Sequence, residues 1–175
     1  MFTTDTSIRV RYAETDQMGV VYHSNFFPYF ETARAESIRQ LGFTYADMEK
    51  MGVIMPVVDV HCRYLRPARY DDLLNVRTTL KELPLQHKIE FHHDVFNEKE
   101  EHLVTARITL YFVEAGSMKK TVMPRQFRRS FNPIFLKFIG WSQPYSMEIR
   151  NPLQGKSPSF FHPNTARKRK SPISG

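Results

Sequence analysis

One stretch of this sequence has the spacing of a long helix, while the rest of its apolar pattern has the spacing of strands. Between residues 24 and 41, small and apolar side chains recur every three or four positions: Phe26, Phe30, Ala33, Ser37 and Leu41. That spacing places them on one face of a helix about five turns long. Pro28 fits this helix only in its first turn, where a missing backbone N–H costs nothing. Ser24 or Asn25 can then supply the N-terminal cap.

Apolar and polar residues alternate in the other segments, which is the two-residue period of a strand with one buried face. Strands are predicted at residues 8–12, 58–64, 74–80, 89–95 and 104–112. Because the later connections are short, neighbouring strands must be antiparallel. The predicted fold class is therefore α+β, an antiparallel sheet of about five strands wrapped around one long central helix. Such a sheet leaves free edges, so we expect dimerisation by edge pairing.

The charge of the chain is unevenly distributed. Residues 1–126 hold 16 Lys and Arg against 17 Asp and Glu, whereas residues 127–175 hold nine against one. The second segment also loses the apolar period and is rich in Pro and Ser. We predict one domain over residues 1–126 and a loosely ordered basic tail over 127–175, with a short helix around 134–139. A nucleic-acid partner for the domain is not indicated, because the basic charge belongs to the tail.

Several classes of protein are disfavoured by the sequence. No segment approaches the roughly 18 apolar residues that span a bilayer, and the first residues do not have the pattern of a signal peptide. The one cysteine, Cys62, cannot form an internal disulfide and is predicted in the core. These features predict a cytoplasmic protein without a membrane span. His92 and His93 must point to opposite faces of a strand, so no metal site is predicted.

A loop that carries carboxylates lies between the first strand and the helix. Unpaired N–H groups at the helix start, near residues 23–27, would face the loop residue Asp16. A carboxylate can act as a nucleophile or general base, and oriented N–H groups can stabilise an oxyanion, so together they can perform acyl transfer. The alternative is that Asp16 only closes a turn or caps the helix.

Two segments of the sequence also resemble a known family. The first reads Tyr12-Ala-Glu-Thr-Asp-Gln-Met-Gly-Val-Val-Tyr-His-Ser-Asn-Phe26 and continues as Tyr29-Phe-Glu-Thr-Ala-Arg34. The second reads Tyr64-Leu-Arg-Pro-Ala-Arg-Tyr-Asp-Asp72. These segments resemble the hotdog-fold acyl-CoA thioesterases of the 4-hydroxybenzoyl-CoA thioesterase and YbgC type. The resemblance covers about residues 5–125 and stops at the tail.

The resemblance implies roles for particular residues. Asp16 would act on the thioester as nucleophile or general base, and the backbone N–H of His23 would bind the carbonyl oxygen. The side chains of His23 and Tyr12 would assist, although Tyr12 on the apolar face of its strand is also explained by packing. Substrate contacts are predicted for Tyr22, Asn25 and Arg66, and Arg66 is a candidate for the phosphates of coenzyme A, as are Arg69 and Lys88. The active sites would lie at a subunit interface of a homodimer or homotetramer.

The predicted function is thus that of an acyl-CoA thioesterase, a hydrolase that releases a free acid and CoA and requires no cofactor. An alternative is a hotdog domain that binds acyl-CoA or an acyl-carrier protein without turnover. In a third hypothesis, the basic cluster Arg167–Lys170 attaches the domain to an acidic partner, such as phosphate, nucleic acid or anionic lipid, although a solvated terminus explains the same residues.

Overall fold

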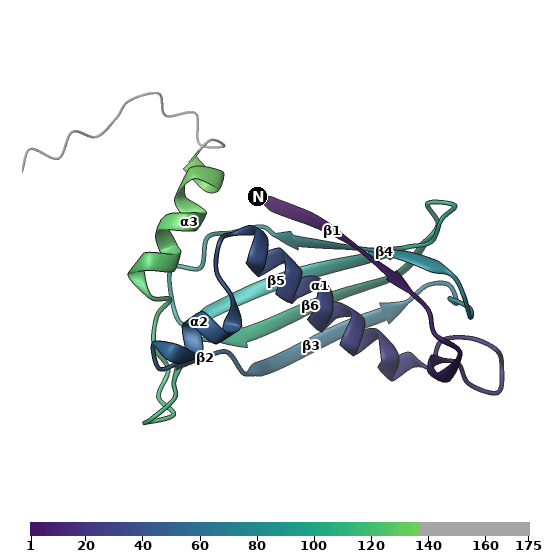
Figure 1. Ribbon diagram of the computed structural model, residues 1–175, viewed down its shortest axis with the longest axis horizontal. Coiled ribbons are helices and arrows are strands. Elements are labelled where there is room, and N and C mark those ends of the chain that lie inside the picture. Colours follow the sequence, from purple (N-terminus) through teal and green to yellow (C-terminus); the bar gives the residue numbers. More distant parts are fainter. Residues whose placement is uncertain (137–175) are drawn as a thin grey trace, which may run out of the picture. The chain divides into compact units, whose positions relative to one another are not determined.

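A computed structural model describes residues 1–136 (Figure 1). Five strands form one antiparallel sheet in the order β1-β4-β5-β6-β3, and helix α1 runs across one face of it. The elements in chain order are β1 (Phe2–Arg9), η1 (Tyr12–Glu14), η2 (His23–Asn25), α1 (Phe26–Gln40), α2 (Tyr45–Lys50), β2 (Val53–Ile54), β3 (Val57–Tyr64), β4 (Leu73–Leu80), β5 (Lys88–Phe96), β6 (His102–Tyr111), β7 (Val113–Glu114) and α3 (Arg125–Leu136). The predicted sheet around one long helix is confirmed.

The core lies between α1 and the sheet. Every second residue of β4, from Leu74 to Leu80, is buried, as the alternation predicted. From α1, Phe30 and Ala33 are fully buried against this face. Burial of one large apolar side chain contributes about 1.5–3 kcal/mol, so this shared face is the main source of stability. Within residues 1–136 no helix is both long and apolar enough to cross a membrane.

Strand β1 ends earlier than predicted. It pairs with β4 from Phe2 opposite Leu80 to Arg9 opposite Leu73, and the chain then turns into η1. The prediction that Tyr12 lies on the buried face of a strand is wrong, since its side chain is 78% exposed. The strand ends before Tyr12 because the Glu14 carboxylate accepts a hydrogen bond from the backbone N–H of Arg11 at 2.7 Å, which turns the chain away from the sheet.

Strand β3 forms one edge of the sheet and pairs with β6. The prediction of a buried face at residues 58–64 is only partly correct. Cys62 is half-buried against the core, as expected. Val58 and Val60, however, remain 46% and 39% exposed. An edge strand with exposed valines offers both unpaired backbone groups and apolar surface.

Helix α3 extends the domain beyond its predicted boundary at residue 126. The buried rings of Phe127 and Phe131 lie 4.3 and 5.8 Å from the ring of Phe43. Their spacing of four residues places both on one face of a helix, which was predicted only around residues 134–139. The predicted loosely ordered tail beyond residue 136, including the basic cluster, lies outside the described residues.

Candidate active site

Residues 15–21 form a tight hairpin that presents Asp16. The Asp16 N–H donates to Val20 O at 2.9 Å, and the Gly19 N–H donates to Asp16 O at 2.9 Å. A bridge between Thr15 and Val21 closes the base of this hairpin. Gly19 has a φ of +71°, in the left-handed region that glycine enters without a Cβ clash. The turn therefore favours glycine at this position.

The Asp16 carboxylate takes part in the turn and also keeps a free oxygen. Its Oδ1 atom accepts a hydrogen bond from the Met18 N–H at 2.8 Å. The structural alternative raised for this residue, that it closes a turn, is therefore observed. In the described part of the chain the carboxylate makes no other hydrogen bond or ion pair. The half-buried side chain is thus held at one oxygen while Oδ2 remains available.

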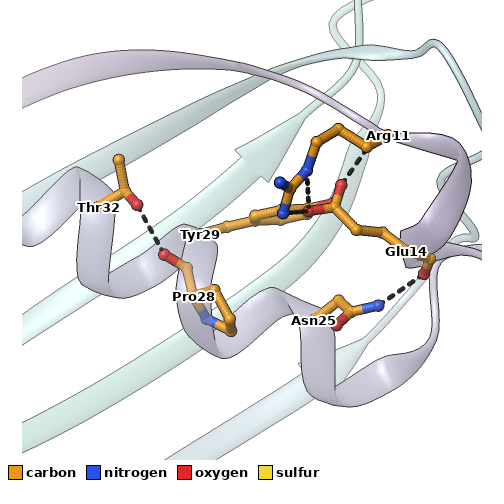
Figure 2. Close-up of polar contacts among 6 residues, drawn as sticks. All are labelled: Arg11, Glu14, Asn25, Pro28, Tyr29 and Thr32. Carbon is orange, nitrogen blue, oxygen red and sulfur yellow. Dashed lines mark hydrogen bonds and ion pairs between the residues drawn. The ribbon is translucent and has the colours of Figure 1, made fainter.

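Glu14 is the anchor of the site, and the sequence analysis did not single it out. The nearly buried Glu14 carboxylate accepts hydrogen bonds from the Arg11 guanidinium at 2.9 and 2.6 Å and from the Tyr29 hydroxyl at 2.6 Å (Figure 2). Burial alone would raise the pKa of Glu14, but hydrogen bonds from Arg11 and Tyr29 outweigh it and hold the pKa below its ordinary value. Burial, reinforced by the Glu14 charge, raises the pKa of Tyr29. The pair is therefore a carboxylate with a neutral phenol.

The backbone of Glu14 ties the far side of the hairpin to the helix start. Its carbonyl oxygen accepts from the Tyr22 N–H at 2.9 Å and from the Asn25 side-chain amide at 2.7 Å (Figure 2). The predicted side-chain cap by Ser24 or Asn25 is wrong, because neither side chain caps η2 or α1. Asn25 cannot cap the helix while its amide group points back to Glu14. It supports the loop instead.

The start of α1 leaves backbone donors free, as predicted. Pro28 is the third residue of α1, within the first turn, where it removes no hydrogen bond. The Thr32 hydroxyl donates to Pro28 O at 2.9 Å (Figure 2). Within residues 1–136, the backbone N–H groups of His23 and Ser24 donate to no acceptor outside their own turn. Two consecutive amides with the positive end of a helix behind them can bind a developing oxyanion.

The second motif segment packs beside this loop. The Val21 N–H donates to Ala68 O at 2.8 Å, and Val20 bridges Arg69. The two segments that were singled out separately in the sequence therefore meet in space. Arg66 lies on the same short connection with an exposed side chain.

The other predicted side chains are exposed near the helix start. The Tyr22 ring is 46% exposed, and its centroid lies 4.2 Å from that of His23, which is also exposed. Tyr12 packs edge-on against Tyr70 with a centroid distance of 5.6 Å. Tyr64 has no predicted role in the second motif segment, yet its hydroxyl donates to His23 O at 3.0 Å. The structure thus adds Glu14 and Tyr64 to the site.

Two hollows formed by the described residues lie away from this loop. One is lined by residues 81–92, and another by residues 51–53 with parts of 114–121. Neither includes Asp16 or His23. His93 is fully buried while His92 is half-buried, so the two rings point to opposite sides of β5 as predicted. Among the described residues, no group of three or more His, Cys, Asp or Glu could hold a metal ion.

Comparison with known proteins identifies the family of this fold. Residues 10–131 match the thioesterase-like superfamily. The chain belongs to this superfamily. It is 38% identical over 131 residues to YneP of Bacillus subtilis, covering 75% of this chain and 91% of that protein. It is also 32% identical over 126 residues to the acyl-CoA thioesterase YbgC of Haemophilus influenzae, covering 71% and 91%.

The fold of this thioesterase-like protein also matches that of a solved thioesterase structure. The DHNA-CoA thioesterase of Staphylococcus aureus aligns with a TM-score of 0.74 and 33% identity, over 79% of this chain and 95% of that chain. The predicted family, the hotdog fold class and the enzyme class, a thioester hydrolase, are confirmed. The superfamily match also runs through Phe127 to Phe131, which agrees with the inclusion of α3 in the domain.

Proposed function

We propose that this chain is an acyl-CoA thioesterase in which Asp16 is the nucleophile or general base. The N–H groups of His23 and Ser24 hold the thioester oxygen. One observation carries this proposal: Asp16 keeps a free carboxylate oxygen on a hairpin that Glu14 O holds to Tyr22 and Asn25, the residues on either side of the free His23 and Ser24 N–H groups. The names of the relatives in this superfamily support acyl-CoA as the substrate.

The reaction adds water across the C–S bond. As a general base, Asp16 takes a proton from a water whose oxygen attacks the thioester carbon. As a nucleophile, Asp16 attacks that carbon itself and forms an anhydride, which water then hydrolyses. In both routes the C–S bond breaks and CoA leaves as a thiolate that needs little protonation. A well-placed oxyanion donor contributes about 3 kcal/mol to lowering the barrier.

The remaining predicted residues surround this reacting centre. We propose that the exposed side chains of Tyr22, His23 and Tyr12 contact the substrate, and that Arg66 binds a phosphate of CoA as a charge-assisted partner. Asn25 is better placed as a support for the loop, because its amide already donates to Glu14 O.

We also propose that a second copy of the chain completes the site. Neither of the two hollows described above for residues 1–136 includes Asp16, whereas the β3 edge exposes Val58 and Val60 beside free backbone groups. Edge pairing of two β3 strands would bury this surface. Assembly into a homotetramer, interaction with an acyl-carrier protein and a cytoplasmic location remain predictions.

The Asp16→Asn variant tests the chemical role. Asn keeps the oxygen that accepts from the Met18 N–H but loses the negative charge, so the hairpin should persist while kcat falls about 100-fold or more. Thiol release from a panel of acyl-CoA esters measures this. Glu98→Gln, the same change at an exposed hairpin residue, is the matched control. Undiminished turnover of Asp16→Asn would remove Asp16 from the mechanism. Tight binding of acyl-CoA by the wild type without thiol release would instead favour the binding alternative.

A further inference from the structure

Tyr64, at the end of β3, makes a hydrogen bond to the turn that precedes α1. It is the last residue of β3, and its hydroxyl crosses to the η2 turn to donate to His23 O at 3.0 Å. The ring centroid of Tyr64 lies 5.7 Å from that of Phe26 and 6.3 Å from that of His23. The phenol therefore bridges the edge of the sheet and the first residues of the helical segment.

The contact acts on a neighbouring donor through one peptide group. The carbonyl of His23 and the N–H of Ser24 belong to the same planar, trans peptide unit, so they point in opposite directions. A hydrogen bond that fixes the carbonyl therefore fixes the direction of the Ser24 N–H as well. It also polarises that N–H, because hydrogen bonds in a chain strengthen one another. The Ser24 N–H has no acceptor outside its own turn among residues 1–136.

The sheet holds the Tyr64 hydroxyl in place. Tyr64 lies opposite Val104 in the β3–β6 ladder, and the next residue, Leu65, donates its N–H to Leu103 O at 2.8 Å. Burial, followed by the neighbouring Cys62, raises the pKa of Tyr64 to about 12. The hydroxyl is therefore protonated, and able to donate, throughout the neutral and mildly alkaline range. Ring packing on the buried Phe26 further limits its movement.

We propose that Tyr64 is a positioning residue of the thioesterase site, whose hydroxyl orients the Ser24 N–H as an oxyanion donor beside the His23 N–H. The inference rests on the proposed function, in which the Ser24 N–H is already a donor, and it adds the residue that orients this N–H. Tyr64 touches no reacting atom itself. Consecutive backbone N–H groups form a concave anion site only when both point to the same position, which makes the orientation of the Ser24 peptide decisive.

Kinetics of the full-length Tyr64→Phe variant test this inference. Phe keeps the ring but removes the hydroxyl donor. We expect kcat to fall about 10-fold, because the Ser24 N–H is still present but is no longer held in the direction of the oxyanion. KM should stay within about two-fold, because the interaction matters mainly in the transition state. Tyr111→Phe is the control, as the Tyr111 hydroxyl makes no hydrogen bond within the described residues. An unchanged kcat in Tyr64→Phe, with an active wild type, would overturn the inference.

A second measurement does not depend on turnover. The probe is a non-hydrolysable acyl-CoA ketone in which CH₂ replaces the thioester sulfur. In Tyr64→Phe we expect the backbone amide resonance of Ser24 to shift and the ketone to bind several-fold more weakly, while Tyr111→Phe leaves both unchanged. A Ser24 resonance and a ketone affinity that do not respond to Tyr64→Phe would contradict the inference. If the wild type releases no thiol, the proposed function fails, and these two readouts still decide whether Tyr64 aims the Ser24 N–H.

Discussion

The Tyr29 hydroxyl donates to the Glu14 carboxylate at 2.6 Å and thereby joins the first turns of α1 to the chain that leads into the Asp16 hairpin. Glu14 also holds Arg11 on one side and, through its backbone oxygen, Tyr22 on the other. A reacting carboxylate and its oxyanion donors must keep their relative positions within about 0.5 Å. Because Asp16 and the helix start both attach to Glu14, this residue sets the distance between them.

The first prediction is that Glu14→Gln lowers both stability and activity. Gln has nearly the same shape but cannot accept from Arg11 as an anion, and its NH₂ group must face an N–H donor of Arg11 whichever carboxylate oxygen it replaces. Loss of hydrogen bonds to a charged, buried group costs about 1.5–3 kcal/mol. We expect the free energy of unfolding in urea to fall by about this amount and kcat to fall as the hairpin loses its anchor.

Glu31→Gln is the matched control for that variant, since Glu31 is an exposed carboxylate on α1, the helix that carries Tyr29. It should change the free energy of unfolding by less than about 0.5 kcal/mol. Equal stability of the Glu14→Gln and Glu31→Gln proteins would show that Glu14 does not anchor the loop.

The second prediction concerns Gly19 and separates conformation from packing. A Cβ added at Gly19 meets no atom within 4 Å, so a larger residue is disfavoured only by the φ of +71°. Gly19→Ala should therefore cost about 1–2 kcal/mol of unfolding free energy and reduce kcat, because the turn that presents Asp16 is strained. Gly19→Asn should recover much of both, since Asn tolerates this conformation. Equal losses in the two variants would contradict this explanation.

Local patterns in the sequence were enough to predict the fold. Thr44 and Asp47 have the spacing of a capping box in the sequence, and the structure contains that box, with the Asp47 N–H donating to Thr44 Oγ1 at 3.1 Å. The helix predicted over residues 24–41 forms as η2 and α1, because a one-sided apolar face specifies where a helix must lie. The register of β4 and β5 likewise follows from their alternation, since a shift of one residue would bury the polar face.

The parts that could not be predicted depend on contacts between distant residues. Tyr12 continues the alternation of β1, but the Glu14 carboxylate ends that strand, and no period signals such a competing hydrogen bond. The contact between Tyr64 and His23 joins residues 41 positions apart. The exposure of Val60 follows from the edge position of β3, which is decided by sheet order rather than by composition. The spacing of Phe127 and Phe131, in contrast, is a local signal of a helix with one buried face.

The third prediction is a loss of stability in mild acid caused by His93. Burial, followed by nearby Arg34, lowers the pKa of His93 to about 3 from the ordinary 6.5. Below pH 6.5, His93 therefore binds a proton in the unfolded chain but not in the folded chain. The free energy of unfolding thus falls as the pH decreases from 6.5 toward 3. One such proton changes the free energy of unfolding by at most about 1.4 kcal/mol per pH unit, or about 2 kcal/mol between pH 6.5 and 5. Urea unfolding across pH 7.5–5 measures this slope.

The control for this slope compares two histidine variants. His93→Phe keeps a flat ring against Phe30 but cannot bind a proton, so its unfolding free energy should depend much less on pH over the same range. His61→Gln, at an exposed position, should keep the wild-type slope. The Glu14 carboxylate, whose pKa is lowered from 4.5, contributes only below that pH and does not disturb the comparison. A wild-type slope in His93→Phe would assign the effect to another group.

The fourth prediction is that a positive charge on the β3 edge dissociates the dimer and, as a result, abolishes thioesterase activity. Val60→Lys places a cation on the exposed edge, where lysine opposes strand pairing. Light scattering should then give the monomer mass, and thiol release should be lost although the Asp16 hairpin is untouched. Val122→Lys, at a position 58% exposed outside the sheet, is the control and should leave both unchanged. An active monomer would show that one chain contains the complete site, and an unchanged wild-type mass in Val60→Lys would place the interface elsewhere.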